Sequence, residues 1–429
     1  MHLKTRIRST GMRYFASAGY LHKQRRKARK LRAKQGGAPM VHYFHQVDDP
    51  YSHLAVQKLD ELKSSYDLEF QPHLVSKPDD AYQGSAAHFD RWAWRDAQSV
   101  AADYGTEFAP AIDIPLPGAV AAANASLAAH LNSEDFAQAA VQIGHALWTQ
   151  QALDEPGDVA AGVQALGRGD ELRRALGHYQ GAMFYFEGEW FWGIDRIRLL
   201  EERLQEEGFG QPSNGLCVPE PTPVDTSGLQ ASEVLLEYFP SLRSPYTAIG
   251  HQRVLDLITR SGVSVDVRPV MPMMMRGIPA PRAKQRYIIT DASREGRTHG
   301  VPFGRIVDPF GEPVKRAFAL FPGAAGLDRA MEFVTAYLSA AWFDGIDITR
   351  DKGLHVVADN AGLDWQTLQA AAADTDWESL LESNLTAMLE ANLWGVPSFR
   401  VSGGKLDTAH ACWGQDRIWR VENEIARRV

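Results

Sequence analysis

Cysteine is nearly absent from this chain: only Cys217 and Cys412 occur among its 429 residues, and no Cys-x-x-Cys motif is present. Two thiols so far apart in sequence argue against a disulfide scaffold, a cysteine-based zinc site and a dithiol redox centre. The simplest expectation is a pair of reduced thiols in a cytoplasmic protein.

Long apolar runs are also absent. Apolar residues make up 45% of the chain and charged residues 23%, as in ordinary globular proteins. The most apolar stretch, residues 317–343, is interrupted by Pro322, Asp328, Arg329 and Glu332, and it falls short of the roughly 18 unbroken apolar residues of a membrane span. We therefore expect no integral membrane segment, and a chain of this length has room for two domains.

Acidic residues are missing from the first 35 positions, which hold 12 of the 45 Lys and Arg residues. The basic run ends at Gly36-Gly37-Ala38-Pro39, a sequence typical of a hinge. Residues 1–40 are therefore predicted to be a basic tail, solvated and without fixed structure. Contact with anionic surfaces, either nucleic acid or membrane, and an organelle transit peptide are the alternatives.

One pattern is written twice. After an apolar strand and a short turn, Pro50-Tyr51-Ser52 and Pro245-Tyr246-Thr247 each open a helix that leads back to a strand. Each copy ends on a strand, a glycine turn, a second strand and a Trp-Gly-x-Asp-Arg-Ile motif, at 192–197 and 413–418. Strand–helix–strand, a helical stretch and a closing hairpin indicate an α/β fold with a mixed sheet, duplicated in tandem.

The domain boundaries follow from these repeats. Residues 41–208 hold the first copy and residues 231–429 the second. Between them, residues 209–230 are rich in Pro, Ser and Gly and are predicted to form a linker.

The second copy resembles a known family. Ser244-Pro245-Tyr246-Thr247 after a strand, Gly395-Val-Pro-Ser-Phe399 and the Trp413–Ile418 motif together resemble the DsbA-like branch of the thioredoxin fold. They are most similar to the group of 2-hydroxychromene-2-carboxylate isomerases and kappa-class glutathione transferases. The resemblance covers nearly all of residues 232–429 and is weaker over 41–207.

The resemblance implies a glutathione site at the amino end of the first helix, where a serine replaces the first cysteine of the disulfide oxidoreductases. Ser244 takes the place of that serine, and Pro397, preceded by Val396, matches the cis-proline facing the site. The other implied glutathione contacts are Asp416 and Arg417 with the neighbouring Gln415 at the γ-glutamyl end, and Lys284 at the glycine carboxylate.

Each of these residues also has a structural interpretation. Ser244 before a proline is a favourable helix cap, and Gln415 and Asp416 suit a helix start. Pro397 could belong to an ordinary turn, and Lys284 could be a solvated loop residue. The conjunction favours chemistry, because a helix amino end and the Ser244 hydroxyl together can stabilise a thiolate. A thiol of pKa about 8.5 needs a shift of roughly one to two units, or about 1.4–2.7 kcal/mol. Arg243 could add positive potential there.

The first copy departs from this pattern. Asp49 stands where the serine should be, and its carboxylate would repel a thiolate. Ala182 occupies the slot of Pro397, and no equivalent of Lys284 is evident. These departures suggest a degenerate domain kept for structure.

The resemblance implies a glutathione-dependent isomerase or transferase acting on an apolar or aromatic small molecule. The methionine-rich segment Met271–Met275 could line a pocket for that molecule, and packing in the core or in a loop explains these methionines at least as well. The alternatives are a non-catalytic thioredoxin-fold binding or scaffold module and, with less support because the cysteine pair is missing, a DsbA-type thiol oxidoreductase. The substrate and the oligomeric state stay open.

Overall fold

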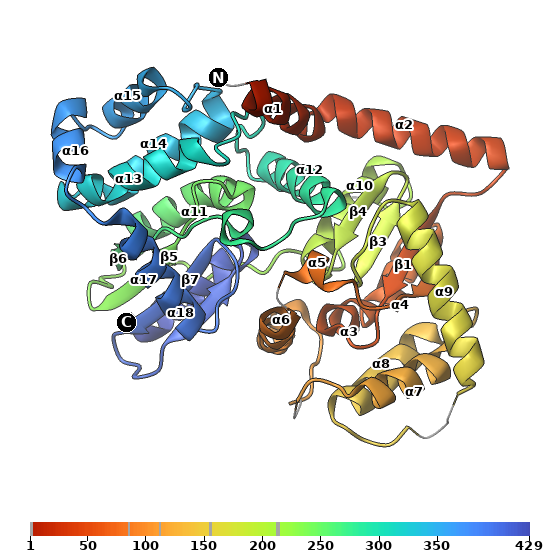
Figure 1. The fold of residues 1–429 in the computed structure, drawn as a ribbon. Helices are drawn as coiled ribbons and strands as arrows, with labels where there is room; N and C mark the ends of the chain where they lie inside the picture. The colour runs from red at the N-terminus through yellow and green to blue at the C-terminus, as the bar shows by residue number, and fades with distance from the viewer. Residues whose placement is uncertain (1–2, 85, 111–112, 154–156, 212–214) are drawn as a thin grey trace. The chain divides into compact units, whose positions relative to one another are not determined.

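The computed structural model describes residues 3–84, 86–110, 113–153, 157–211 and 215–429. The chain divides into two compact units (Figure 1). The N-terminal unit comprises residues 21–221 and 280–284, and the C-terminal unit comprises residues 1–20, 222–279 and 285–429. The division at residues 221 and 222 falls within the segment expected to be a linker.

The N-terminal unit is built on a four-stranded sheet of order β2-β1-β3-β4. Strand β1 pairs parallel with β2 and antiparallel with β3, and β3 and β4 form a hairpin. Its elements are α2 (Ala18–Gln35, shared at its start with the other unit), β1 (Met40–His45), α3 (Pro50–Val56), α4 (Leu59–Ser65), β2 (Glu69–Leu74), α5 (Asp80–Gln83), α6 (Ala86–Val100), α7 (Pro117–Ala128), α8 (Phe136–Trp148), α9 (Val159–Ala175), β3 (Met183–Phe186), β4 (Glu189–Trp192) and α10 (Ile197–Glu206).

The C-terminal unit repeats this arrangement with a sheet of order β6-β5-β7-β8 and the same directions of pairing. Its elements are α1 (Leu3–Ala16), β5 (Val234–Phe239), α11 (Pro245–Ser261), β6 (Ser264–Val267), α12 (Arg282–Thr298, whose first residues group with the other unit), α13 (Glu312–Gly326), α14 (Ala330–Leu338), α15 (Asp351–Asn360), α16 (Trp365–Ala372), α17 (Trp377–Glu390), β7 (Ser398–Gly403), β8 (His410–Trp413) and α18 (Ile418–Arg428).

Several apolar clusters hold the C-terminal unit together, and two of them flank the sheet and fill the helical layer. Alternate residues of β5, such as Leu236 and Tyr238, are buried with residues of α11 and α18 on one face of the sheet. The helices between β6 and β7 bury their own large cluster, centred on residues such as Trp342 and Phe333. In Figure 1 these helices, α13 to α16, form a layer of their own beside the sheet. Strand β7 runs antiparallel to β5, with Ser398 opposite Phe239. The start of β7 therefore lies at the end of the sheet where β5 leads into α11.

The expectation that residues 1–40 form an unstructured tail is wrong, because most of this segment is helical. Helix α1 packs on the C-terminal unit, where Asp308 N donates to Ser9 Oγ (2.9 Å) and Arg13 Nε donates to Ile306 O (2.7 Å). In the N-terminal unit, Arg25 of α2 pairs with the buried carboxylate of Glu189 at 2.7 Å. The basic residues thus have acidic partners that lie far away in sequence, which local composition cannot reveal.

Candidate active site

Ser244 lies at the junction of β5 and α11. It is the N-cap of α11: Thr247 N donates to its Oγ at 3.1 Å, and Pro245 is the first residue of the helix. Because α11 is 17 residues long, its free N–H groups and its dipole concentrate positive potential at this end. Ser244 is 7% exposed, so the tip is largely shielded from water.

The start of β7 lies beside this helix tip. Ser244 Oγ donates to Val396 O at 3.3 Å, and the peptide bond between Val396 and Pro397 is cis. Gly414 N, at the end of β8, donates to Pro397 O at 2.9 Å. Three segments that are far apart in sequence, around Ser244, Val396–Pro397 and Gly414, therefore meet at one point.

Gly395 packs closely against the indole of Trp413. A Cβ atom at position 395 would lie 2.2 Å from the Trp413 ring, so this position admits no side chain unless the indole moves. The close approach fixes the loop that carries Val396 and Pro397.

Gln415, Asp416 and Arg417 form a 3₁₀ turn before α18. Gln415 is buried, accepts a hydrogen bond from Arg253 and donates from Nε2 to Glu295 Oε2 at 2.9 Å. Arg417 is 2% exposed. Only Asp416 of the three is half-exposed, so it is the member that a ligand reaches most readily. The burial of Gln415 and Arg417 favours a structural role for both side chains. Their contact with glutathione is still a prediction.

Lys284 groups with the N-terminal unit, apart from Ser244. Its Nζ donates to Tyr82 O at 2.6 Å, and burial lowers the pKa of Lys284 to about 8. The proposed contact of Lys284 with the glycine carboxylate of glutathione is still a prediction.

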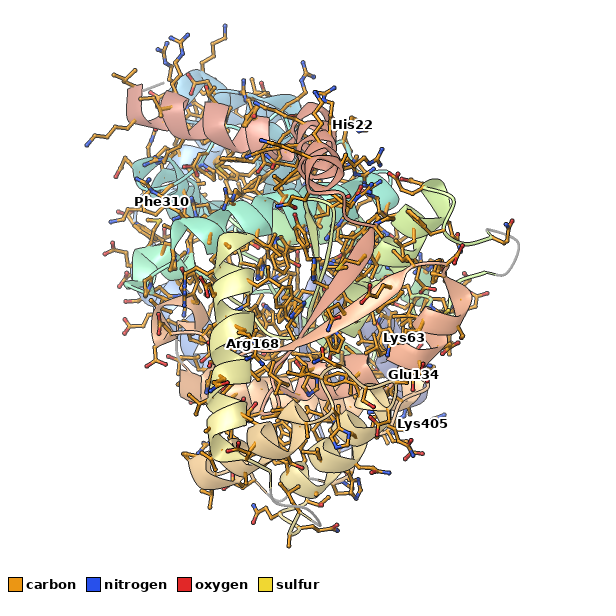
Figure 2. The ribbon with its side chains drawn as sticks, turned by 90° about the vertical axis from the view of Figure 1, so that its right-hand side faces the viewer. His22, Lys63, Glu134, Arg168, Phe310 and Lys405 are labelled. Carbon is orange, nitrogen blue, oxygen red and sulfur yellow. The ribbon has the colours of Figure 1, made fainter. Side chains whose placement is uncertain are left out.

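Arg243 points to Asp308. Its Nε lies 3.0 Å from Asp308 Oδ1, and its guanidinium stacks 4.7 Å from the ring centre of Phe310, which is labelled in Figure 2. Asp308 is completely buried, so its charge is compensated by Arg243 and by Arg8 at 2.7 Å. Arg243 is therefore engaged in an ion pair with Asp308, whose negative charge offsets the potential that Arg243 would add near Ser244.

A contact that the sequence analysis missed occurs in both units. Tyr246 OH donates to Asp291 Oδ2 at 2.8 Å, and Tyr51 OH donates to Asp96 Oδ2 at 2.7 Å. Both pairs are separated by 45 residues, a spacing that a comparison of the two copies could have revealed. The tyrosine of each Pro-Tyr motif is thus tied to the helix that follows the βαβ unit.

The N-terminal unit repeats the geometry around Ser244 with different side chains. Asp49 caps α3, and its Oδ2 accepts from Ser52 N (3.2 Å) and from Ser52 Oγ (2.9 Å). Gly193 N donates to Ala182 O at 2.8 Å, in the manner of Gly414 and Pro397. Burial above all raises the pKa of Asp49 to about 7, with a smaller effect from Asp48.

Replacing Asp49 by asparagine tests this shift. Because the folded protein holds a proton on Asp49 that the unfolded chain releases, the wild type loses stability as pH rises from about 4 to about 7. We expect the free energy of unfolding of Asp49→Asn, minus that of the wild type, to be larger at pH 8 than at pH 5. Urea unfolding at both pH values measures the difference, and a pH-independent difference would contradict a protonated carboxyl.

Comparison with known proteins assigns the C-terminal unit. A family model described as the DSBA-like thioredoxin domain matches residues 235–426. These residues form a DsbA-like thioredoxin domain. The α/β fold expected for the second copy is thereby confirmed, with β5 near its start and α18 at its end. The same strand order in the N-terminal unit agrees with a duplication, although the family model matches only the DsbA-like domain.

Solved structures resemble just under half of the chain. A 2-hydroxychromene-2-carboxylate isomerase aligns at 18% identity over 45% of this chain and 95% of its own, with a TM-score of 0.36. The cytosolic disulfide reductase DsbM from Pseudomonas aeruginosa aligns at 16% identity over 45% and 98%, with a TM-score of 0.37. A probable DsbA oxidoreductase from Streptomyces coelicolor aligns at 17% identity over 46% and 91%, with a TM-score of 0.35. A search of curated proteins finds no match.

Two further observations bear on the chemistry. Within the described ranges, no three His, Cys, Asp or Glu side chains are grouped to hold a metal ion. Cys217 lies in the N-terminal unit and Cys412 is buried in β8 of the DsbA-like domain; both are free thiols. Burial raises the pKa of Cys217 to about 11, which makes it a poor nucleophile at neutral pH.

Proposed function

We propose that the DsbA-like domain is a glutathione-dependent isomerase or transferase that acts on an apolar or aromatic small molecule. The observation that carries this proposal is the position of Ser244 Oγ, at the tip of a 17-residue helix and 3.3 Å from Val396 O. A hydroxyl donor and a helix amino end suit a sulfur anion, and the domain has no cysteine at this position.

The residues present fit glutathione in two respects. The Ser241 hydroxyl is buried in the turn before α11 and has no hydrogen-bond partner among the described residues, so a polar group remains to be satisfied near the tip. In addition, the Ser244 proton makes only a long bond to Val396 O and can turn to a stronger acceptor.

When bound, glutathione supplies the thiol that the tip of α11 lacks. Ser244 and the first turn of α11 orient that thiol and favour its ionised form. A hydrogen bond to a charged acceptor contributes about 1.5–3 kcal/mol, which covers the shift of one to two pKa units that ionisation at neutral pH requires. A thiolate held in this way can add to an electrophilic carbon and leave again, or remain as a conjugate.

The apolar part of a substrate has a plausible neighbour in the turn Met273–Arg276. Its three methionines are half-exposed, and Met274 Sδ lies 3.6 Å from Arg243 Nη1, next to Ser244 in sequence. Flexible, polarizable methionine side chains adapt to apolar ligands. In the proposed site, Met274 would supply an adaptable apolar contact to the substrate next to Arg243, while Met275 packs on the core.

Calorimetry of the full chain tests the proposal. We expect glutathione and S-methylglutathione to bind the wild type. At pH 8 the Ser244→Ala variant should bind glutathione more weakly, whereas its affinity for S-methylglutathione, which has no ionisable thiol, should be unchanged. Absence of heat with either ligand at millimolar concentration, with folded protein, would end the proposal.

A second candidate is a non-catalytic binding module. The Ser244 hydroxyl already accepts from Thr247 N and donates to Val396 O, which a purely structural cap also does. If Ser244→Ala changes stability but neither glutathione binding nor thiol transfer, this candidate is preferred. We further propose that the N-terminal unit is a degenerate copy, since Asp49 and Ala182 occupy the places of Ser244 and Pro397.

A further inference from the structure

Helix α1 docks on the C-terminal unit through Met12, Phe15 and Ala16, yet it also carries large apolar side chains on its other face. The face against the C-terminal unit includes Thr5, Ser9 and Ala16, which are buried. The face away from it carries Leu3, which is 72% exposed, and Ile7, which is 63% exposed. Large aliphatic side chains are normally placed on the buried stripe of such a helix, so this exposure requires a reason.

Leu3, Ile7 and Tyr14 form one stripe. They are spaced four and seven residues apart and so share a helix face, and Tyr14 is 44% exposed. We call these three residues the apolar stripe of α1. Several exposed apolar side chains in a row mark an interaction surface more often than single ones do.

Cations surround the apolar stripe. Lys4 and Arg6 flank it on α1, are exposed, and have no acidic partner within the described part of the chain. Residues 1–35 contain no Asp or Glu, so no negative charge of this segment offsets them. The surface therefore combines apolar side chains with unpaired positive charge.

Helix α2, which lies mainly in the N-terminal unit, carries basic residues of its own on two faces. Its arginines at 25, 29 and 32 pair with carboxylates of the N-terminal unit. Its other face carries exposed cations without an acidic partner among the described residues, namely Arg26, Lys27, Lys30 and Lys34. These four positions lie within about 100° of one another around the helix axis. Figure 2 shows nitrogen-tipped side chains of the N-terminal helices extending away from the ribbon.

We propose that α1 binds the surface of a membrane that contains anionic lipids. Apolar side chains inserted at the headgroup level and cations held near negative headgroups act together in interfacial helices. Nucleic acid explains the cations but leaves the apolar stripe exposed, because phosphate recognition requires no aliphatic side chains. No helix in the described part of the chain is long and apolar enough to cross a membrane, so the contact is peripheral.

Vesicle co-sedimentation with the full chain tests the proposal. We expect binding to phosphatidylcholine vesicles that contain phosphatidylserine, with a partition coefficient at least about tenfold above that for pure phosphatidylcholine, because each cation near an anionic surface adds attraction. Raising the salt concentration should weaken binding, since the lipid charges are screened. The double variant Leu3→Ser with Ile7→Ser should bind at least about tenfold less, since its apolar contribution is removed.

The control is the double variant Val159→Ser with Val163→Ser. These valines have the same four-residue spacing on α9 and are 64% and 65% exposed, so the change in exposed apolar area is comparable. Circular dichroism should show both variants folded, and the control should bind vesicles as the wild type does.

Each of the following results would overturn the proposal. The first is equal sedimentation with charged and neutral vesicles, or no sedimentation with either. The second is loss of binding in the valine control to the same degree. The third is a dimer in solution that the double variant Leu3→Ser with Ile7→Ser dissociates. A further contrary result is an oligonucleotide that displaces the protein from vesicles and binds the wild type and this double variant equally well.

Discussion

Replacing Ser244 by cysteine is expected to produce a thiol with a pKa between about 6 and 7.5, well below the ordinary value of about 8.5. The thiolate would receive the Thr247 N–H bond that now reaches Ser244 Oγ at 3.1 Å, at the end of a 17-residue helix. Burial of this position opposes the shift, so we expect a moderate depression. The absorbance of the thiolate, followed against pH with the wild type as the blank, measures the pKa.

Asp49→Cys is the matched control. It occupies the same place in the N-terminal unit and is equally buried, but α3 has only seven residues and Asp48 adds a neighbouring acid. We expect its thiol to titrate clearly above that of Ser244→Cys. Equal pKa values in the two variants, or a value above about 8.5 for Ser244→Cys, would show that the tip of α11 has no special affinity for a sulfur anion.

Replacing Gly395 by alanine is expected to destabilise the DsbA-like domain by about 1–3 kcal/mol, because the added methyl group overpacks a filled site. The new Cβ would lie 2.2 Å from the Trp413 ring, so the indole or the loop before Pro397 must move. Since that loop carries Val396, we expect glutathione binding to weaken as well. Urea unfolding and calorimetry of the same preparation give the two quantities.

Gly326→Ala is the control for this variant. Gly326 ends α13 in the same unit, and no atom lies within 4 Å of a Cβ built there. Alanine in a helix is favoured over glycine by up to about 1 kcal/mol, so the control should be neutral or slightly stabilised. A Gly395→Ala protein as stable as this control would contradict the tight packing on Trp413.

The features that depend on short stretches of sequence could be predicted. The Ser244-Pro245 pair at the start of a helix is a local capping signal, and the structure has it as the N-cap of α11. The pattern of strand, glycine turn and strand that precedes the Trp413–Ile418 motif likewise leads to the hairpin of β7 and β8. The repetition of these patterns indicated two similar units, and both sheets have the same strand order.

The features that depend on distant partners could not be predicted from the sequence. Arg243 adjoins Ser244 in sequence, yet the buried Asp308 draws its side chain into an ion pair. The sequence places Gln415 at a helix start but does not show its burial, which arises because Gly250 of α11 allows Gln415 to approach closely. The basic run of α2 reads as a solvated tail, yet Glu187 and Glu189 lie opposite its arginines. In each case the deciding group lies more than 60 residues away in the chain.

The pKa of the glutathione thiol bound to this protein tests the central claim most directly. We predict that thiolate absorbance of the complex, titrated against pH, gives a pKa of about 6.5–7.5 in the wild type and a value about one unit higher in Ser244→Ala. A bound thiol that titrates like free glutathione in both proteins would contradict the account, because Ser244 and the tip of α11 would then contribute nothing to its ionisation.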